Sequence, residues 1–236
     1  MPVRPVVEKE KQGMREEMIY LATYRTESRE ADREREHRLG RMLLEAGLMR
    51  EYGRTWEAAQ DETGRPCLKG APSHVDFNIS HTHGLVVCAV SGCRVGVDAE
   101  LIRPVRESLC RRVLAEEERE LLERTALTHG EGAAAELFTR LWTLKESYGK
   151  ATGAGLGYPL RETAFIRRPD GTWEGNTPGF VYEQTKVYGR YIISLCLGGQ
   201  GNARPAQKPV QSPAQNPAQS PAQNPAQSPA SPGADI

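Results

Sequence analysis

The feature that most limits how this chain can fold is a change of composition near Gly198. Beyond it, proline recurs at every fourth position from Pro205 to Pro229, among alanines and glutamines. Proline lacks a backbone donor and fixes φ, and the tract has too little apolar area to offset the entropy of ordering it. We therefore expect residues 199–236 to form a disordered tail. The fold is then confined to about 180 preceding residues, enough for one domain or two small halves that share a core.

Charge and cysteine content exclude several classes of protein. Lys and Arg together number 31, as do Asp and Glu, so the sequence predicts no strong bulk attraction to nucleic acid or to a membrane surface. No apolar run is long enough to span a bilayer, and the N-terminus lacks the apolar core of a signal peptide. The five cysteines show no CxxC spacing. They are typical of a reduced, cytoplasmic protein, although a disulfide between Cys88 and Cys93 remains an alternative.

Apolar periodicity predicts an α+β chain. The runs Leu85–Val90 and Cys93–Glu100, separated by a short turn, are interpreted as an antiparallel hairpin. The other expected strands are 18–24, a strand ending at His81, 163–168, 179–185 and 190–197; the expected helices are 33–52, 115–122 and 134–152, with a turn at 26–32 and a loop at 125–133. After a poorly ordered lead-in at 1–17, each of the segments 18–94 and 95–198 then holds strands and a long helix, although no clear sequence repeat relates them.

Two acidic residues at the end of a strand suggest a metal site. Side chains alternate between the faces of a strand, so Asp98 and Glu100 project from one face and Ala99 from the other. Two carboxylates on one face repel unless they are solvated or share a cation. Mg²⁺ prefers such oxygen ligands, commonly together with substrate phosphates. A solvated strand end is the alternative, but the apolar run Val95–Val97 places the pair at the rim of a core strand.

The helix expected at 134–152 carries Glu146 one turn before Lys150, and a glycine-rich segment at 153–157 follows. Phe138, Leu141, Trp142, Leu144 and Tyr148 supply its buried side, and Lys145, Glu146 and Lys150 are expected on one flank. Acid, base and flexible backbone in this order suggest a phosphate site with a metal. An ordinary surface ion pair worth roughly 0.2–0.5 kcal/mol is the alternative.

Two arginines are candidates for contacts with phosphate. Arg65 is expected at the tip of a turn, where its guanidinium could meet a phosphate as a fork of donors. Arg38 lies on the basic face of the helix expected at 33–52, for which simple solvation is the alternative. Neither arginine is specific evidence by itself.

Three motifs in order resemble those of the 4′-phosphopantetheinyl transferase superfamily. They are Phe77-Asn-Ile-Ser-His81, then Gly96-Val-Asp-Ala-Glu100, then Phe138…Trp142-x-x-Lys145-Glu146-Ser147-x-x-Lys150-x-x-Gly153-x-Gly155. Their order and spacing are similar to the surfactin-synthetase-activating type, and the resemblance covers roughly Met18 to Gly198. It implies a pseudo-dimeric α+β fold in one chain. Each of two similar halves would be a small antiparallel sheet packed with a long helix.

The resemblance also implies an activity. Such enzymes use Mg²⁺ to move the phosphopantetheine arm of coenzyme A onto a serine of an apo acyl or peptidyl carrier protein, and they release 3′,5′-ADP. The motif match implies that Asp98, Glu100 and Glu146 hold the metal and that Glu146, Lys150 and His81 are catalytic. It implies that coenzyme A is bound by Arg38, Arg65, Ser80, His81 and Lys150.

The chain departs from the family pattern at two positions, and other functions remain open. Arg65 stands where lysine is usual, and Ala99 where a larger apolar residue is usual; the choice between Arg35 and Arg38 is not settled by the sequence. The expected protein is a cytoplasmic monomer. Alternatives are another Mg²⁺-dependent phosphoryl-transfer enzyme, which the absence of a GxxxxGK[ST] motif disfavours, and a non-catalytic relative that only binds coenzyme A or a carrier.

Overall fold

The computed structural model describes residues 4–5, 18–62, 64–154 and 158–198. The proline-rich segment 199–236 and the glycines Gly155 and Gly157 lie outside the described residues, so the predictions made for them stay predictions. The chain divides into two compact units, Met1–Pro205 and Ala206–Ile236. Everything below concerns the first unit. No helix in the described ranges is long and apolar enough to cross a membrane.

The first of two main sheets packs against helix α1 (Arg29–Tyr52). All its strands pair antiparallel. In spatial order they are β1 (Arg4–Pro5), β2 (Met18–Thr23), β6 (Leu85–Ser91) and β5 (Asp76–Thr82). The helix begins earlier than predicted, because the Ser28 side chain accepts a hydrogen bond from the Ala31 N–H at 3.3 Å and caps its N-terminus. A small hairpin of β3 (Ala58–Gln60) and β4 (Pro66–Leu68) surrounds the turn that contains Arg65.

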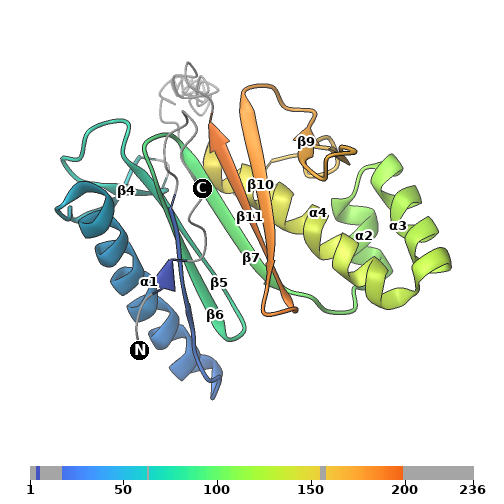
Figure 1. The fold of residues 1–236 in the computed structure, drawn as a ribbon, viewed down its shortest axis with the longest axis horizontal. Coiled ribbons are helices and arrows are strands. Elements are labelled where there is room, and N and C mark those ends of the chain that lie inside the picture. The colour runs from blue at the N-terminus through green and yellow to red at the C-terminus, as the bar shows by residue number, and fades with distance from the viewer. Residues whose placement is uncertain (1–3, 6–17, 63, 155–157, 199–236) are drawn as a thin grey trace, which may run out of the picture. The chain divides into compact units, whose positions relative to one another are not determined.

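The second main sheet packs against helix α4 (Glu131–Thr152). Its strands are also antiparallel neighbours. They are β7 (Val95–Leu101), β11 (Tyr191–Gly198), β10 (Phe180–Val187), β9 (Trp173–Gly175) and β8 (Phe165–Arg167). Two further helices, α2 (Glu107–Val113) and α3 (Glu116–His129), lie beyond α4 (Figure 1). The α+β class is therefore confirmed.

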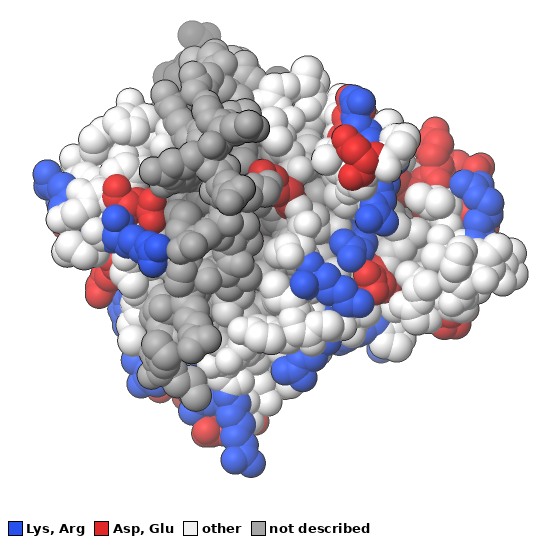
Figure 2. Space-filling view, in the orientation of Figure 1, with Lys and Arg blue, Asp and Glu red and all other residues white. Residues whose placement is uncertain are grey.

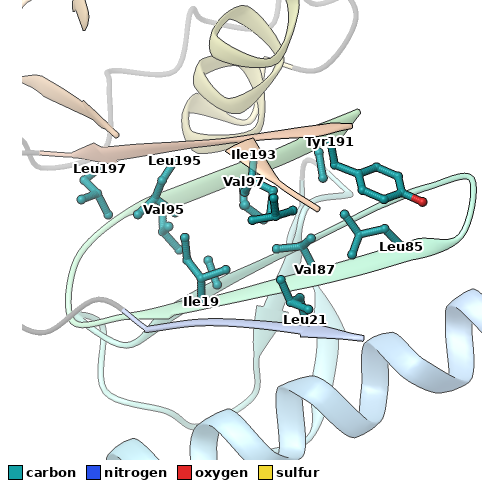
Figure 3. Close-up of a cluster of buried hydrophobic side chains, with 13 residues drawn as sticks. Ile19, Leu21, Leu85, Val87, Val95, Val97, Tyr191, Ile193, Leu195 and Leu197 are labelled. Atoms are coloured by element: carbon teal, nitrogen blue, oxygen red, sulfur yellow. The ribbon is translucent and has the colours of Figure 1, made fainter. Parts of the chain in front are cut away.

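An apolar layer joins the two sheets. Figure 3 shows that Ile19, Leu21, Leu85 and Val87 of the first sheet meet Val95, Val97 and Ile193 of the second. The alternate residues of β6, Val86, Cys88 and Val90, pack with α1 in a separate cluster. Both faces of β6 are thus buried, which explains its continuous apolar sequence.

Three local predictions are wrong. The runs Leu85–Val90 and Cys93–Glu100 do not form a hairpin, because β6 pairs with β2 and β5 while β7 pairs with β11. The chain crosses from one sheet to the other between Ser91 and Val95, and the two runs meet face to face. The loop predicted at 125–133 is mostly helix, since α3 continues to His129 and only Gly130, with φ 85°, separates it from α4. The turn predicted at 26–32 is in part the first turn of α1.

Candidate active site

Side chains of β5 satisfy the free backbone edge of β7. β7 is the outer strand of its sheet. Every second residue along it points its N–H toward the free edge, and these N–H groups donate to side chains rather than to another strand. The three hydrogen bonds are Val95 N to Asp76 Oδ2 at 2.9 Å, Val97 N to Asn78 Oδ1 at 3.0 Å and Ala99 N to Ser80 Oγ at 3.2 Å. We call this set the β5–β7 seam. It fixes the register between the two sheets at the strand that carries the predicted metal ligands.

The opposite residues of β7 face α4, as the period-two argument predicts. Gly96 allows the helix to come close: a Cβ built on it would lie 2.0 Å from the Ser147 carbonyl oxygen and 2.4 Å from the Ala151 nitrogen. Asp98 and Glu100 follow on the same face of the strand. The close crossing therefore brings these two carboxylates to the helix that carries Glu146 and Lys150.

Asp98 is the most buried of the candidate ligands, with 5% of its surface exposed. Its Oδ1 accepts from Lys150 Nζ at 2.7 Å and from Ser80 Oγ at 3.0 Å. Its Oδ2 is buried and accepts no hydrogen bond from the described residues. A buried carboxylate oxygen without a donor is costly, so this atom indicates a missing partner.

Glu100 and Glu146 share the electrostatic environment of Asp98. Burial, and next the Asp98 carboxylate, raise the pKa of Glu100. The same two causes, in the same order, raise the pKa of Glu146, and Lys150 opposes them. Thr82 Oγ1 donates to Glu100 Oε2 at 2.9 Å, and Trp142 also hydrogen-bonds the Glu100 side chain. The Asp98 carboxylate thus lies near enough to disfavour ionisation of Glu100 and Glu146, and a bound cation would relieve this repulsion.

Lys150 and Ser80 complete this group. The Lys150 ammonium donates to Asp98, to Ser80 Oγ at 2.9 Å and to the Val97 carbonyl at 3.1 Å. The alternative of a surface pair between Glu146 and Lys150 is therefore not what this helix forms. Ser80 Oγ accepts from Ala99 N and Lys150 and donates to Asp98, so its hydrogen-bonding capacity is used within the protein.

Lys145 does not share a flank with Glu146 and Lys150, contrary to expectation. It is fully buried, and its Nζ lies 2.8 Å from Glu118 Oε2 and 2.9 Å from the Leu160 carbonyl. The neighbouring residue on a helix projects about 100° away, which is enough to send the two side chains of a Lys-Glu pair to different places. Lys145 ties α3 and the segment after the glycines to α4.

Arg65 is engaged away from the carboxylate group. All five of its guanidinium N–H groups have acceptors: two meet Asp76 at 2.9 and 2.8 Å, and the others meet the carbonyls of Lys150, Pro66 and Val95. With 7% of its surface exposed, it braces the β5–β7 seam. Its predicted contact with phosphate would require these bonds to be exchanged.

His81 and Arg38 are also separate from the carboxylates. Ser80 points toward β7, whereas His81, on the other face of β5, points toward α1, where its Nδ1 lies 3.1 Å from Glu36 Oε2. Arg38 is exposed on α1. The structure thus brings Ser80, Asp98, Glu100, Glu146 and Lys150 together. The three other candidates, Arg65, His81 and Arg38, lie outside this group.

Three residues near the carboxylates were not predicted to take part. Thr82 lies two residues after Ser80 on the same strand face, and Trp142 lies four before Glu146 on the helix, so strand and helix periodicity could have indicated both. Tyr158 donates to the Lys145 carbonyl at 2.7 Å, and burial, followed by the Glu146 charge, raises its pKa. It follows the glycine segment, and no pattern in the sequence pointed to it.

The carboxylate oxygens suit a hard divalent cation, but in this structure they do not converge on one position where an ion could bind. In the described part of the chain, no three His, Cys, Asp or Glu side chains are arranged so that they could hold a metal ion as they stand. The partnerless Asp98 Oδ2 and the raised pKa values of Glu100 and Glu146 nevertheless fit a cation bound by oxygen. Small side-chain movements at Glu100 and Glu146 would be needed.

Comparison with known proteins finds one family model and several similar proteins. Residues 94–196 match the family model described as the 4′-phosphopantetheinyl transferase superfamily. The 4′-phosphopantetheinyl transferase Sfp of Bacillus subtilis is 29% identical over 136 residues, which are 56% of this chain and 58% of that protein. A second 4′-phosphopantetheinyl transferase of Bacillus subtilis is 29% identical over 190 residues, 73% of this chain and 83% of that protein.

A third relative matches a shorter stretch of the chain at higher sequence identity. The 4′-phosphopantetheinyl transferase HetI of Nostoc is 39% identical over 101 residues, 41% of each chain. The chain thus covers less than two thirds of the length of the first and third of these relatives. Residues 94–196, which hold Asp98, Glu100, Glu146 and Lys150, are thus similar to the 4′-phosphopantetheinyl transferase superfamily.

Proposed function

We propose that the chain is a 4′-phosphopantetheinyl transferase. It would move the phosphopantetheine arm of coenzyme A onto a serine of an acyl or peptidyl carrier protein and release 3′,5′-ADP. The observation that carries the proposal is the buried Oδ2 of Asp98, which accepts no hydrogen bond from the described residues and lies in a group with Glu100, Glu146 and Lys150. Such a group costs stability while its buried carboxylates lack a cation, which favours a role in binding over a purely structural one.

Asp98, Glu100 and Glu146 are proposed to hold Mg²⁺. When bound, the ion would neutralise the coenzyme A pyrophosphate and polarise the attacked phosphorus. The seam keeps Asp98 in register, and Thr82 and Trp142 orient Glu100. These neighbours reduce the movement that the ligands need.

The chain's own residues supply the rest of the chemistry. Glu146, whose pKa is raised by burial and then by Asp98, accepts the proton of the carrier serine as the serine oxygen bonds to phosphorus. The bond from that phosphorus to the leaving 3′,5′-ADP oxygen then breaks. Lys150 leaves Asp98 for the phosphates and stabilises the charge that develops there. His81 and Arg38 would contact coenzyme A phosphates at the edge of the site, whereas Ser80 and Arg65 would act mainly by holding Asp98 and the seam.

The fold is proposed to be two similar halves, 18–94 and 95–198, in one chain. Each half has an antiparallel sheet and a long helix, α1 or α4, and the seam and the apolar layer join them. A single chain with both halves needs no partner copy to build the site, so we propose a monomer in the cytoplasm. The segment 199–236 is proposed to lie outside these halves, whereas within the predicted lead-in 1–17 β1 (Arg4–Pro5) pairs with β2 of the first half.

The carrier is proposed to dock on residues 115–136. A cavity of about 770 Å³ lies between α2, α3 and the start of α4. It is lined by apolar residues and by side chains of both charges: Arg103, Arg111, Arg119, Glu107, Glu123 and Glu131. On the face seen in Figure 2, basic and acidic side chains are intermixed over the described residues. A small basic patch, with Arg106 just before α2 and Arg112 on it, would therefore select an acidic carrier locally rather than through net charge.

The test is transfer to an apo carrier. Wild-type protein with Mg²⁺ and coenzyme A should add the mass of the phosphopantetheine arm to an apo acyl or peptidyl carrier. Glu146→Gln should fold with an unchanged melting temperature and lose nearly all transfer. If no carrier in a broad panel gains the mass, the chain is either a binding relative or another Mg²⁺-dependent phosphoryl-transfer enzyme. Calorimetry with coenzyme A separates these two.

A further inference from the structure

A carboxylate on α1 lies directly behind His81. Glu36 Oε2 is 3.1 Å from His81 Nδ1, and Glu36 Oε1 accepts a hydrogen bond from the Tyr24 hydroxyl. Only 12% of the Glu36 side chain is exposed, against 53% of the His81 side chain. Glu36 therefore links Tyr24, which follows β2, to His81 near the end of β5, and its side chain is largely buried.

The partners on Glu36 have fixed roles. Burial, and then the hydrogen bond to Glu36, raise the pKa of Tyr24 to about 12, so this phenol remains a donor at neutral pH. An ionised carboxylate only accepts, so the proton between Glu36 and His81 sits on Nδ1. Phe77 and Ile79, which precede His81 on the same face of β5, pack in the α1 cluster and hold the strand against the helix.

We propose that Glu36 is a positioning residue for His81, with Tyr24 holding Glu36 in place. Glu36 fixes Nδ1 as the protonated nitrogen and aims the exposed edge of the ring, with Nε2, away from α1. A phosphate that meets this edge would find Nε2 already directed toward it by the carboxylate behind the ring. The proposal rests on the proposed function in one respect: the phosphate is taken to be the 3′-phosphate of coenzyme A.

The direction in which coenzyme A affinity changes distinguishes a positioning role of Glu36 from a simple effect of its charge. Removal of a negative charge near an anion site should by itself strengthen binding of coenzyme A. Loss of a positioning carboxylate should weaken it, by about three- to tenfold if one hydrogen bond to phosphate is lost. Glu34, two residues earlier and exposed on α1, provides a matched control because Glu34→Ala removes the same charge from the same helix.

Calorimetry with two ligands, coenzyme A and 3′-dephospho-coenzyme A, tests whether Glu36 acts through His81. Glu36→Ala should weaken binding of coenzyme A about three- to tenfold and leave binding of the dephospho form unchanged, and Glu34→Ala should weaken neither. In a His81→Ala background, Glu36→Ala should have no further effect. Unchanged or tighter binding by Glu36→Ala, or equal weakening in both backgrounds, would overturn the proposal. Glu36→Gln serves if the alanine variant does not fold.

A second measurement does not depend on the transferase activity. Nitrogen NMR of the His81 ring in the ligand-free protein should show Nδ1 as the protonated nitrogen, and Glu36→Ala should remove this preference. An unchanged ring tautomer in Glu36→Ala would refute the positioning role even if transfer is fully active. Failure of the wild-type protein to modify a carrier would instead refute the proposed function and leave the ring measurement intact.

Discussion

The crossing of α4 over β7 predicts a large effect for a very small change, Gly96→Ala. The added methyl group would lie 2.0 Å from the Ser147 carbonyl oxygen, whereas ordinary contacts begin near 3.4 Å. Both close neighbours are backbone atoms of the helix, so no side-chain rotation relieves the overlap. The helix or the strand must move apart by on the order of 1 Å, and such overpacking costs roughly 1–3 kcal/mol.

This movement also opens the site. It separates Asp98 and Glu100 on the strand from Glu146 and Lys150 on the helix, and a displacement of about 1 Å can lower an enzymatic rate on the order of 100-fold. We therefore expect Gly96→Ala to lower the free energy of unfolding in a urea titration and to lower transfer to the carrier far more than the population of folded protein falls. Activity should be measured at a temperature where the variant is folded.

A matched control lies on the same helix. At Gly132 a Cβ would meet no atom within 4 Å, and the residue is exposed in the first turn of α4. Gly132→Ala should stabilise the protein by roughly 0.5–1 kcal/mol, because alanine loses less entropy in a helix. It serves as a control for stability alone, since Gly132 lies in the segment proposed to dock the carrier. If Gly96→Ala stabilised the protein as this control does and kept wild-type transfer, the close crossing would not be what positions the site.

Three further outcomes follow from the seam and the carboxylates. Arg65→Ala should lower the free energy of unfolding by roughly 3–5 kcal/mol because it leaves Asp76 buried without its partner. An unchanged urea midpoint would contradict this structural role and leave Arg65 with a role in binding only. Asn78→Ala should cost about 1–3 kcal/mol by leaving the Val97 N–H unsatisfied, and a neutral result would mean that water replaces the side chain. Mg²⁺ should raise the melting temperature of the wild-type protein but not of Asp98→Asn, and equal shifts in both would exclude Asp98 as a ligand.

The sequence predicted those parts of the site that depend on local periodicity. Asp98 and Glu100 do share one face of β7, and Glu146 and Lys150 do lie on a long helix, because strand and helix repeats fix such relations over a few residues. The α+β class followed from the same patterns. The joining of these elements into one group was predicted only through the resemblance to a family.

Most of the errors share a physical cause, which is contact between distant segments. A run of apolar residues cannot reveal whether its neighbour lies beside it or across a layer, so β6 and β7 were taken for a hairpin. Polarity suggested a loop at 125–133, although a single glycine with positive φ was enough to end one helix and begin the next. Arg65 and Lys145 were assigned by type, but buried partners far along the chain, Asp76 and Glu118, decide where they lie.

The β5–β7 seam has a consequence for solubility. An outer strand with free N–H groups is a template on which a strand from another molecule can add, and apolar outer strands such as β7 are prone to aggregation. The side chains of Asp76, Asn78 and Ser80 already occupy these donors, so β7 offers no vacant ladder along this stretch. The same three side chains that set the register at Asp98 thus also keep the most apolar edge of the second sheet from recruiting other chains.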